Sequence, residues 1–130
     1  MWVLDTNTLI YFFKGEGRVA DNLLARAPRD IGIPTIVVYE LELGIAKSAS
    51  PAQRRRQLGE LTSIVQVLGF HQREAEAAAA VRAALENEGR PIGPYDTLIA
   101  GTALAHGSIL VTHNTREFGR ISDLRVEDWY

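Results

Sequence analysis

Short apolar runs are the feature that most constrains how this chain folds. Four of them, at residues 2–4, 31–33, 64–68 and 109–112, are strand-sized, and segments with helical spacing of apolar residues lie between them. Short buried strands that alternate with helices favour a parallel sheet covered by helices on both faces. The length of 130 residues suits one domain over residues 1–130, so a single α/β domain is expected.

The helical segments carry recognisable starts. Proline stands at or next to the first helical position of three segments, which are expected near residues 35–48, from 51 onward and over 94–105. The alanine-rich stretch 72–88 has the composition with the highest helix propensity. The polar run 53–57 is expected on the solvated side of its helix.

Composition and charge exclude several classes of protein. With no cysteine, disulfide scaffolds, thiolate zinc sites and cysteine nucleophiles are ruled out. No apolar run approaches the roughly 18 residues that span a bilayer, and the first residues lack the pattern of a signal peptide. A cytoplasmic protein without membrane contact is therefore expected. The net charge of -2 means that any nucleic-acid contact must come from a local patch.

Polar residues follow two of the predicted strands, at the edge where parallel sheets gather ligands. Asp5 ends the first run, and Thr112, Asn114 and Glu117 follow the run at 109–112. Asp96 lies in the first turn of its helix, where an acid also stabilises the helix dipole. Its apolar neighbours on the helix argue for a further role.

Two more acids, Glu40 and Glu42, lie on the helix expected near residues 35–48. Each has apolar residues three and four positions away, and the two point to nearly opposite sides of the helix. A buried and unpaired carboxylate is costly, so each requires a cation, a metal ion or access to solvent. Periodicity alone does not choose between them.

Taken together, the acids suggest a carboxylate cluster. Like charges pack together only when a cation neutralises them, and oxygen ligands select Mg²⁺ or Mn²⁺ over zinc. Such a site typically acts on phosphate esters. The histidines favour ordinary roles, with His71 and His106 near helix ends and His113 without a second histidine at ligand spacing.

Four motifs resemble the PIN-domain family, and especially the VapC-type toxins of bacterial toxin–antitoxin pairs. They are VLDTN at residues 3–7, ELELG at 40–44, IGPYDTLIA at 92–100 and VTHNTREF at 111–118. The resemblance extends to LRVEDW at 124–129 and so covers essentially the whole chain. It implies a three-layer α/β/α domain and a Mg²⁺-dependent endoribonuclease, with Mn²⁺ as a substitute ion.

The family pattern also implies roles for individual residues. Its first three acids fall on Asp5, Glu40 and Asp96, since the second motif reads Glu-Leu-x-x-Gly. Many relatives carry Asp where this chain has Asn114, so the fourth acid is assigned to Glu117, with Asn114 as the alternative. Further candidates are supporting residues Asn7, Thr112 and Asn114, and RNA contacts Lys47 and Arg116.

The same resemblance implies partners. It predicts a homodimer and a cognate antitoxin that places a basic side chain in the acidic site, with operator DNA bound only by the toxin–antitoxin complex. The subgroup that this chain is similar to cleaves initiator tRNA in the anticodon stem-loop, so tRNA is the expected RNA substrate.

Other classes of protein fit the sequence less well. A receiver domain requires paired acids after the first strand and a lysine at the sheet edge, but no lysine lies beyond Lys47. A haloacid-dehalogenase-like phosphatase requires a second Asp two residues after the first, but this chain has Asn7 at that position. A catalytically inactive PIN-fold binding protein remains the third alternative, and the retained acids argue against it.

Overall fold

The computed structural model describes all 130 residues and contains one five-stranded sheet. Every neighbouring pair of strands is parallel, and the spatial order is β3-β2-β1-β4-β5. The strands are β1 (Trp2–Leu4), β2 (Ile31–Pro34), β3 (Gln66–Leu68), β4 (Ile109–Val111) and β5 (Val126–Glu127). The predicted parallel α/β sheet is therefore confirmed.

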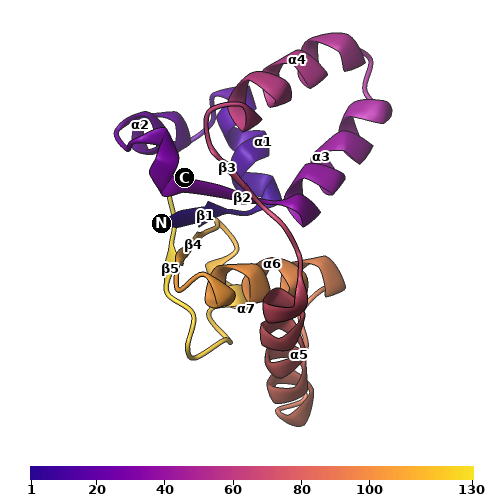
Figure 1. The fold of residues 1–130 in the computed structure, drawn as a ribbon, viewed down its shortest axis with the longest axis vertical. Helices are drawn as coiled ribbons and strands as arrows, with labels where there is room; N and C mark the ends of the chain where they lie inside the picture. The colour runs from indigo at the N-terminus through magenta and orange to yellow at the C-terminus, as the bar shows by residue number, and fades with distance from the viewer.

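Helices cover both faces of this sheet (Figure 1). They are α1 (Thr6–Lys14), α2 (Val19–Leu24), α3 (Thr35–Ala46), α4 (Pro51–Thr62), α5 (Gln72–Asn87), α6 (Pro94–Ala105) and α7 (Thr115–Phe118). Helices α1, α3 and α4 gather on one side of the sheet, and α5 and α6 lie on the other. This arrangement is the expected three-layer α/β/α architecture.

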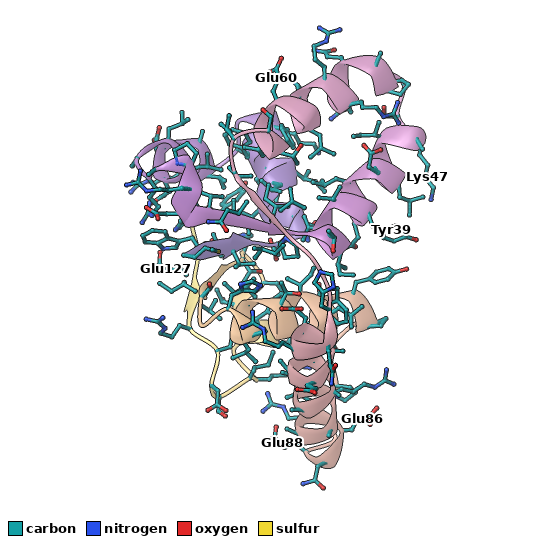
Figure 2. The ribbon with its side chains drawn as sticks, in the orientation of Figure 1. Tyr39, Lys47, Glu60, Glu86, Glu88 and Glu127 are labelled. Carbon is teal, nitrogen blue, oxygen red and sulfur yellow. The ribbon has the colours of Figure 1, made fainter.

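The core lies between the sheet and these helices. Strand residues Val3, Leu4, Ile33, Leu110 and Val111 are fully buried, which explains why the strand sequences are continuous apolar runs. In contrast, the outer end of α5 projects beyond the sheet, and Glu86 and Glu88 point into solvent there (Figure 2). No helix combines the length and apolar character that crossing a membrane requires.

One predicted strand is shorter than the sequence suggests. The apolar run at 64–68 contributes only Gln66–Leu68 to the sheet, as edge strand β3. The backbone N–H groups of Ile64 and Val65 both donate to the carbonyl of Leu61, so these residues continue the last turn of α4. Backbone hydrogen bonding at the helix end therefore outweighs the strand preference of the branched side chains.

Parallel pairing brings separate parts of the chain to one edge of the sheet. Leu4 pairs with Val111, so the residues after β1 and β4 emerge side by side. Helix α3 begins directly after β2 at the same edge, because β2 runs parallel to β1. The predicted site lies at this carboxyl edge.

Candidate active site

Asp5 links β1 to α1 and is the most enclosed acid at this edge, with 4% of its surface exposed. It is the N-cap of α1, where its Oδ1 accepts from the Thr8 backbone N–H at 2.9 Å. Its Oδ2 accepts from the Thr112 hydroxyl at 2.5 Å. Burial raises the pKa of Asp5, and the hydrogen bonds from Thr112 and Thr8 lower it only in part.

A chain of hydrogen bonds continues from Thr112 to Glu117. The backbone N–H of Asn114 donates to the Thr112 hydroxyl at 3.0 Å. The Asn114 side-chain amide then donates to Oε2 of Glu117 at 2.8 Å. The structure therefore places Asn114 as the group that holds the Glu117 carboxylate, a relationship that residue spacing alone did not reveal.

The structure separates the two acids of α3 that periodicity left undecided. Oε1 of Glu40 accepts from the Thr6 hydroxyl at 2.7 Å, which ties Glu40 to the first residue of α1 beside Asp5. Glu42 points the other way and lies 3.6 Å from Nε of Arg55 on α4. Glu40 is thus the α3 acid that faces the edge, and Glu42 has a surface ion-pair partner.

Asp96 lies in the first turn of α6 and accepts no hydrogen bond from another side chain. The pKa of Asp96 is raised to about 6, first by burial and then by the charges of Asp5, Glu40 and Glu117. The charges of Asp5, Glu40 and Glu117 thus reach Asp96, in line with the placement of these acids at the carboxyl edge of the sheet. We call Asp5, Glu40, Asp96 and Glu117 the carboxylate cluster.

The carboxylate cluster has the donor chemistry of a hard divalent cation. No Lys or Arg lies within 4.0 Å of any of its four carboxylates, and carboxylate oxygens are the ligands that such an ion prefers. No three acidic or histidine side chains converge closely enough, as they stand, to hold a metal ion. The charge and the ligand type of these residues nevertheless fit such an ion.

The other candidate residues lie outside this cluster. Asn7 is exposed on α1, Lys47 is exposed at the end of α3, and Arg116 is exposed beside Glu117 on α7. His113 contacts Asp128 at 2.9 Å through Nδ1, and its ring stacks on Tyr130 with centroids 4.3 Å apart. His113 therefore packs against the C-terminal residues, in line with an ordinary structural role.

The two remaining histidines lie at helix ends, as expected. His71 is the N-cap of α5, and its backbone N–H donates to Glu74 at 2.8 Å. His106 is the C-cap of α6 and lies 3.5 Å from the buried Glu74 carboxylate. Neither histidine reaches the carboxylate cluster.

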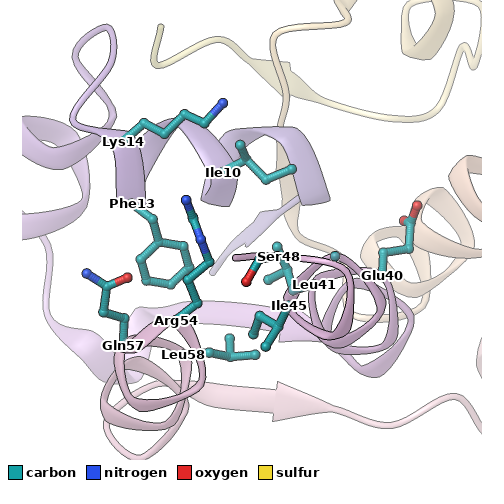
Figure 3. Close-up of a pocket in the computed structure, with 11 residues that line it drawn as sticks. Ile10, Phe13, Lys14, Glu40, Leu41, Ile45, Ser48, Arg54, Gln57 and Leu58 are labelled. Atoms are coloured by element: carbon teal, nitrogen blue, oxygen red, sulfur yellow. The ribbon is translucent and has the colours of Figure 1, made fainter. Parts of the chain in front are cut away.

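A cavity of about 260 Å³ opens beside Glu40, between α1, α3 and α4 (Figure 3). Its wall is apolar where Ile10, Phe13 and Leu58 line it, and basic at Lys14 and Arg54. Arg54 comes from the polar run 53–57, which lies largely on the solvated side as expected. The helical hairpin of α3 and α4 thus turns part of that run toward the cavity.

Comparison with known proteins decides the family. The model of the PIN domain matches residues 2–124 of this sequence. The chain belongs to the PIN-domain family. This agrees with the parallel sheet and with the acids at its carboxyl edge.

Relatives that match over their full length show which group of PIN domains this chain resembles. It is 35% identical over 128 residues to the "tRNA(fMet)-specific endonuclease VapC" of Shigella flexneri, which covers 98% of this chain and 97% of that protein. It is 34% identical over 131 residues to "Ribonuclease VapC1" of Haemophilus influenzae strain R2866, which covers 99% and 98%. This PIN domain therefore groups with VapC ribonucleases along its whole length.

Solved structures agree with this grouping. VapBC2 from Rickettsia felis, bound to a DNA fragment from its promoter, matches the PIN domain with a TM-score of 0.92 and 34% identity. DNA-bound VapBC from Salmonella typhimurium also matches with a TM-score of 0.92, at 35% identity. Each alignment covers 99% of this chain and 98% of the compared chain.

Proposed function

We propose that residues 1–130 act as one PIN domain with metal-dependent endoribonuclease activity, and that this protein is the toxin of a toxin–antitoxin pair. The observation that carries the proposal is the carboxylate cluster, in which three acidic neighbours and burial raise the pKa of Asp96 to about 6. Several unpaired negative charges close together destabilise the folded state unless they bind a cation. The identity to VapC ribonucleases over the full chain supports RNA as the substrate.

PIN-domain ribonucleases in general depend on a metal ion, and here Asp5, Glu40 and Asp96 would hold Mg²⁺ or Mn²⁺, with Glu117 in support. The bound ion would activate water and stabilise the leaving oxygen of a phosphodiester. The protein's own part is to orient the ligands. Thr8 and Thr112 fix Asp5, Thr6 holds Glu40, and Asn114 holds Glu117.

We further propose tRNA as the RNA substrate, with initiator tRNA cut in the anticodon stem-loop. The relative from Shigella flexneri is named a tRNA(fMet)-specific endonuclease, which supports this choice. The exposed cations Lys47 and Arg116 flank the carboxylate cluster in sequence and would contact phosphates. A local cationic contact is what a chain with a net charge of -2 requires for RNA binding.

The partners follow from the same relatives. Because the matched structures are VapBC complexes, we propose a cognate antitoxin that places a basic side chain among the cluster acids. Glu40 lines both the cluster and the neighbouring cavity, so a segment that reaches the acids would also cover the apolar wall of that cavity. We also propose a homodimer, with operator DNA bound through the antitoxin.

The test is sequencing of RNA 5′ ends after exposure of total tRNA to purified, antitoxin-free protein. Defined new ends that require Mg²⁺ or Mn²⁺, vanish with a chelator and are absent for Asp96→Asn support the proposal. Asp21→Asn, at an exposed acid in the first turn of α2, is the matched control and should cleave normally. Failure of folded wild-type protein to cleave any RNA would favour an inactive PIN-fold binding protein.

A further inference from the structure

Two tyrosines form an exposed pair beside the carboxylate cluster. Tyr39 on α3 directly precedes Glu40, and Tyr95 on α6 directly precedes Asp96. Their ring centroids are 5.6 Å apart at an angle of 63°, and their hydroxyl oxygens are 3.5 Å apart. The pair therefore joins two elements that each supply an acid to the cluster.

This tyrosine pair is not part of the core. The exposed fraction is 50% for Tyr39 and 43% for Tyr95, although large aromatic side chains usually bury most of their surface. Each ring lies one residue before an acid of the carboxylate cluster and is open to solvent.

An exposed strip on α3 continues from this pair. Tyr39, Leu43 and Lys47 are all exposed and recur every four residues, so they lie along one face of the helix. Eight residues of helix span about 12 Å at about 1.5 Å per residue. Figure 2 shows Tyr39 and Lys47 projecting from the same side of α3. Lys47 forms no ion pair within 4.0 Å.

Aromatic rings followed by a free cation are typical of single-stranded nucleic acid sites, where bases stack on the rings and phosphates contact the cations. A protein interface core favours aromatic residues and is depleted of lysine. The hydroxyl groups and the unpaired Lys47 therefore favour RNA over a second protein surface here.

We propose that Tyr39 and Tyr95 form a stacking platform for an unpaired base next to the scissile phosphate, and that Lys47 contacts a phosphate farther along the strand. This rests on the proposed ribonuclease function and adds to it the residues that position the RNA. Such a platform requires unstacked bases at the cut, so it selects loops over continuous duplex.

The test pairs protein variants with altered RNA. Dissociation constants are measured in Mg²⁺ on the Asp96→Asn background, with a synthetic RNA that spans the mapped cut and with versions lacking one base within three nucleotides of it. Tyr39→Ala and Tyr95→Ala should weaken binding of the intact RNA roughly 5- to 100-fold. Tyr39→Phe and Tyr95→Phe, which keep the rings, should stay within about threefold of the parent, and Leu24→Ala on α2 serves as the exposed control.

The dissociation constants for the altered RNA distinguish base stacking from a merely structural role of the tyrosines. At one position, removal of the base should weaken binding of the RNA to the parent Asp96→Asn protein as much as the alanine substitutions do. With that abasic RNA, Tyr39→Ala and Tyr95→Ala should cause no further loss of affinity. The proposal is overturned if no abasic position matters, if the two penalties add in full, or if Tyr39→Ala and Tyr95→Ala instead shift the oligomeric state seen by light scattering. Wild-type protein that cleaves normally while these results fail contradicts the platform alone, whereas absence of any cleavage contradicts the ribonuclease proposal itself.

Discussion

Thr112 donates its hydroxyl hydrogen to the carboxylate of Asp5 across 107 positions of sequence, with Oγ1 and Oδ2 2.5 Å apart. Both side chains are buried, and they follow the adjacent parallel strands β4 and β1. The bond lowers the pKa of Asp5 and so opposes the effect of burial. It therefore favours the ionised form of this deeply placed acid, which is the form that binds a metal ion.

Thr112→Val keeps the shape of the side chain and removes this donor. The pKa of Asp5 should rise further, so the acidic limb of the cleavage profile should move to higher pH. Loss of a buried hydrogen bond to a charged group should also cost about 1–3 kcal/mol of folding free energy. Thr102→Val is the matched control, because buried Thr102 donates to the Leu98 carbonyl far from the acids. An unshifted pH profile in Thr112→Val would show that this bond does not tune Asp5.

Asp96→Asn should stabilise the metal-free protein at neutral pH. The folded-state pKa of about 6 lies above the ordinary 3.8, so ionised Asp96 disfavours the fold fully above pH 6 and progressively less as the pH falls toward 3.8. Partial exposure and the lost helix-dipole interaction leave a net gain of about 1 kcal/mol. A melting temperature higher by roughly 5 °C at pH 7, but unchanged near pH 4, is expected from thermal unfolding.

The same thermal-unfolding experiments show whether Asp96 is a metal ligand or only stabilises its helix. Added Mg²⁺ should stabilise wild-type protein and should do so much less in Asp96→Asn. Asp21→Asn, which loses only a first-turn helix interaction, should melt slightly lower than wild type at pH 7 and keep the Mg²⁺ effect. If Asp96→Asn behaves like Asp21→Asn, Asp96 supports its helix and is no ligand.

Glu117 and Asn114 should contribute unequally to metal dependence. Glu117→Gln should raise the Mg²⁺ concentration for half-maximal cleavage about tenfold or more, since a carboxylate suits a hard cation better than an amide. Asn114→Ala should have a smaller effect, because it only frees the Glu117 side chain that Asn114 holds at 2.8 Å. Glu86→Gln on exposed α5 is the control. The reverse order of effects would assign the fourth position to Asn114.

Arg26 should be a main support of the C-terminal segment. Its guanidinium lies 4.5 Å from the ring centroids of both Trp2 and Trp129, and Nη1 donates to the Asn22 carbonyl at 2.7 Å. Arg26→Gln should lower the free energy of unfolding by about 2 kcal/mol and Arg26→Lys by less. Urea unfolding measures this, with Arg29→Gln, an exposed arginine just before β2, as control. Equal stability of Arg26→Gln and Arg29→Gln would rule the contribution out.

Lys47 and Arg116 should each supply one phosphate contact. Lys47→Ala or Arg116→Ala should weaken RNA binding and reduce the slope of log affinity against log salt by about 0.7–0.9. Arg55→Ala should leave the slope unchanged, because Arg55 belongs to the solvated face of α4 and lies near Glu42. Filter-binding at several salt concentrations tests this, and a slope that changes only in Arg55→Ala would move the RNA surface to α4.

Local patterns in the sequence determined the kind of fold and most of the candidate acids. Apolar runs of strand length predicted the buried strands, and proline positions predicted the starts of α4 and α6. Asp5 was identified at the end of the first strand, and its hydrogen bond from the Thr8 backbone shows that it also caps α1. These features depend on neighbours within about four residues, where spacing along the chain determines spacing in the structure.

Only the tertiary structure decided which distant groups meet. It turned Glu40 toward Thr6 and Glu42 toward Arg55, and it showed that Asn114 holds Glu117. It also formed the Tyr39–Tyr95 pair, the cavity beside α3 and the contacts of Arg26 with two tryptophan rings, none of which the sequence indicated. Each of these contacts depends on strand register and on how helices dock onto the sheet. A periodic pattern specifies which face of a helix is apolar, but the packing of the whole chain selects what that face meets.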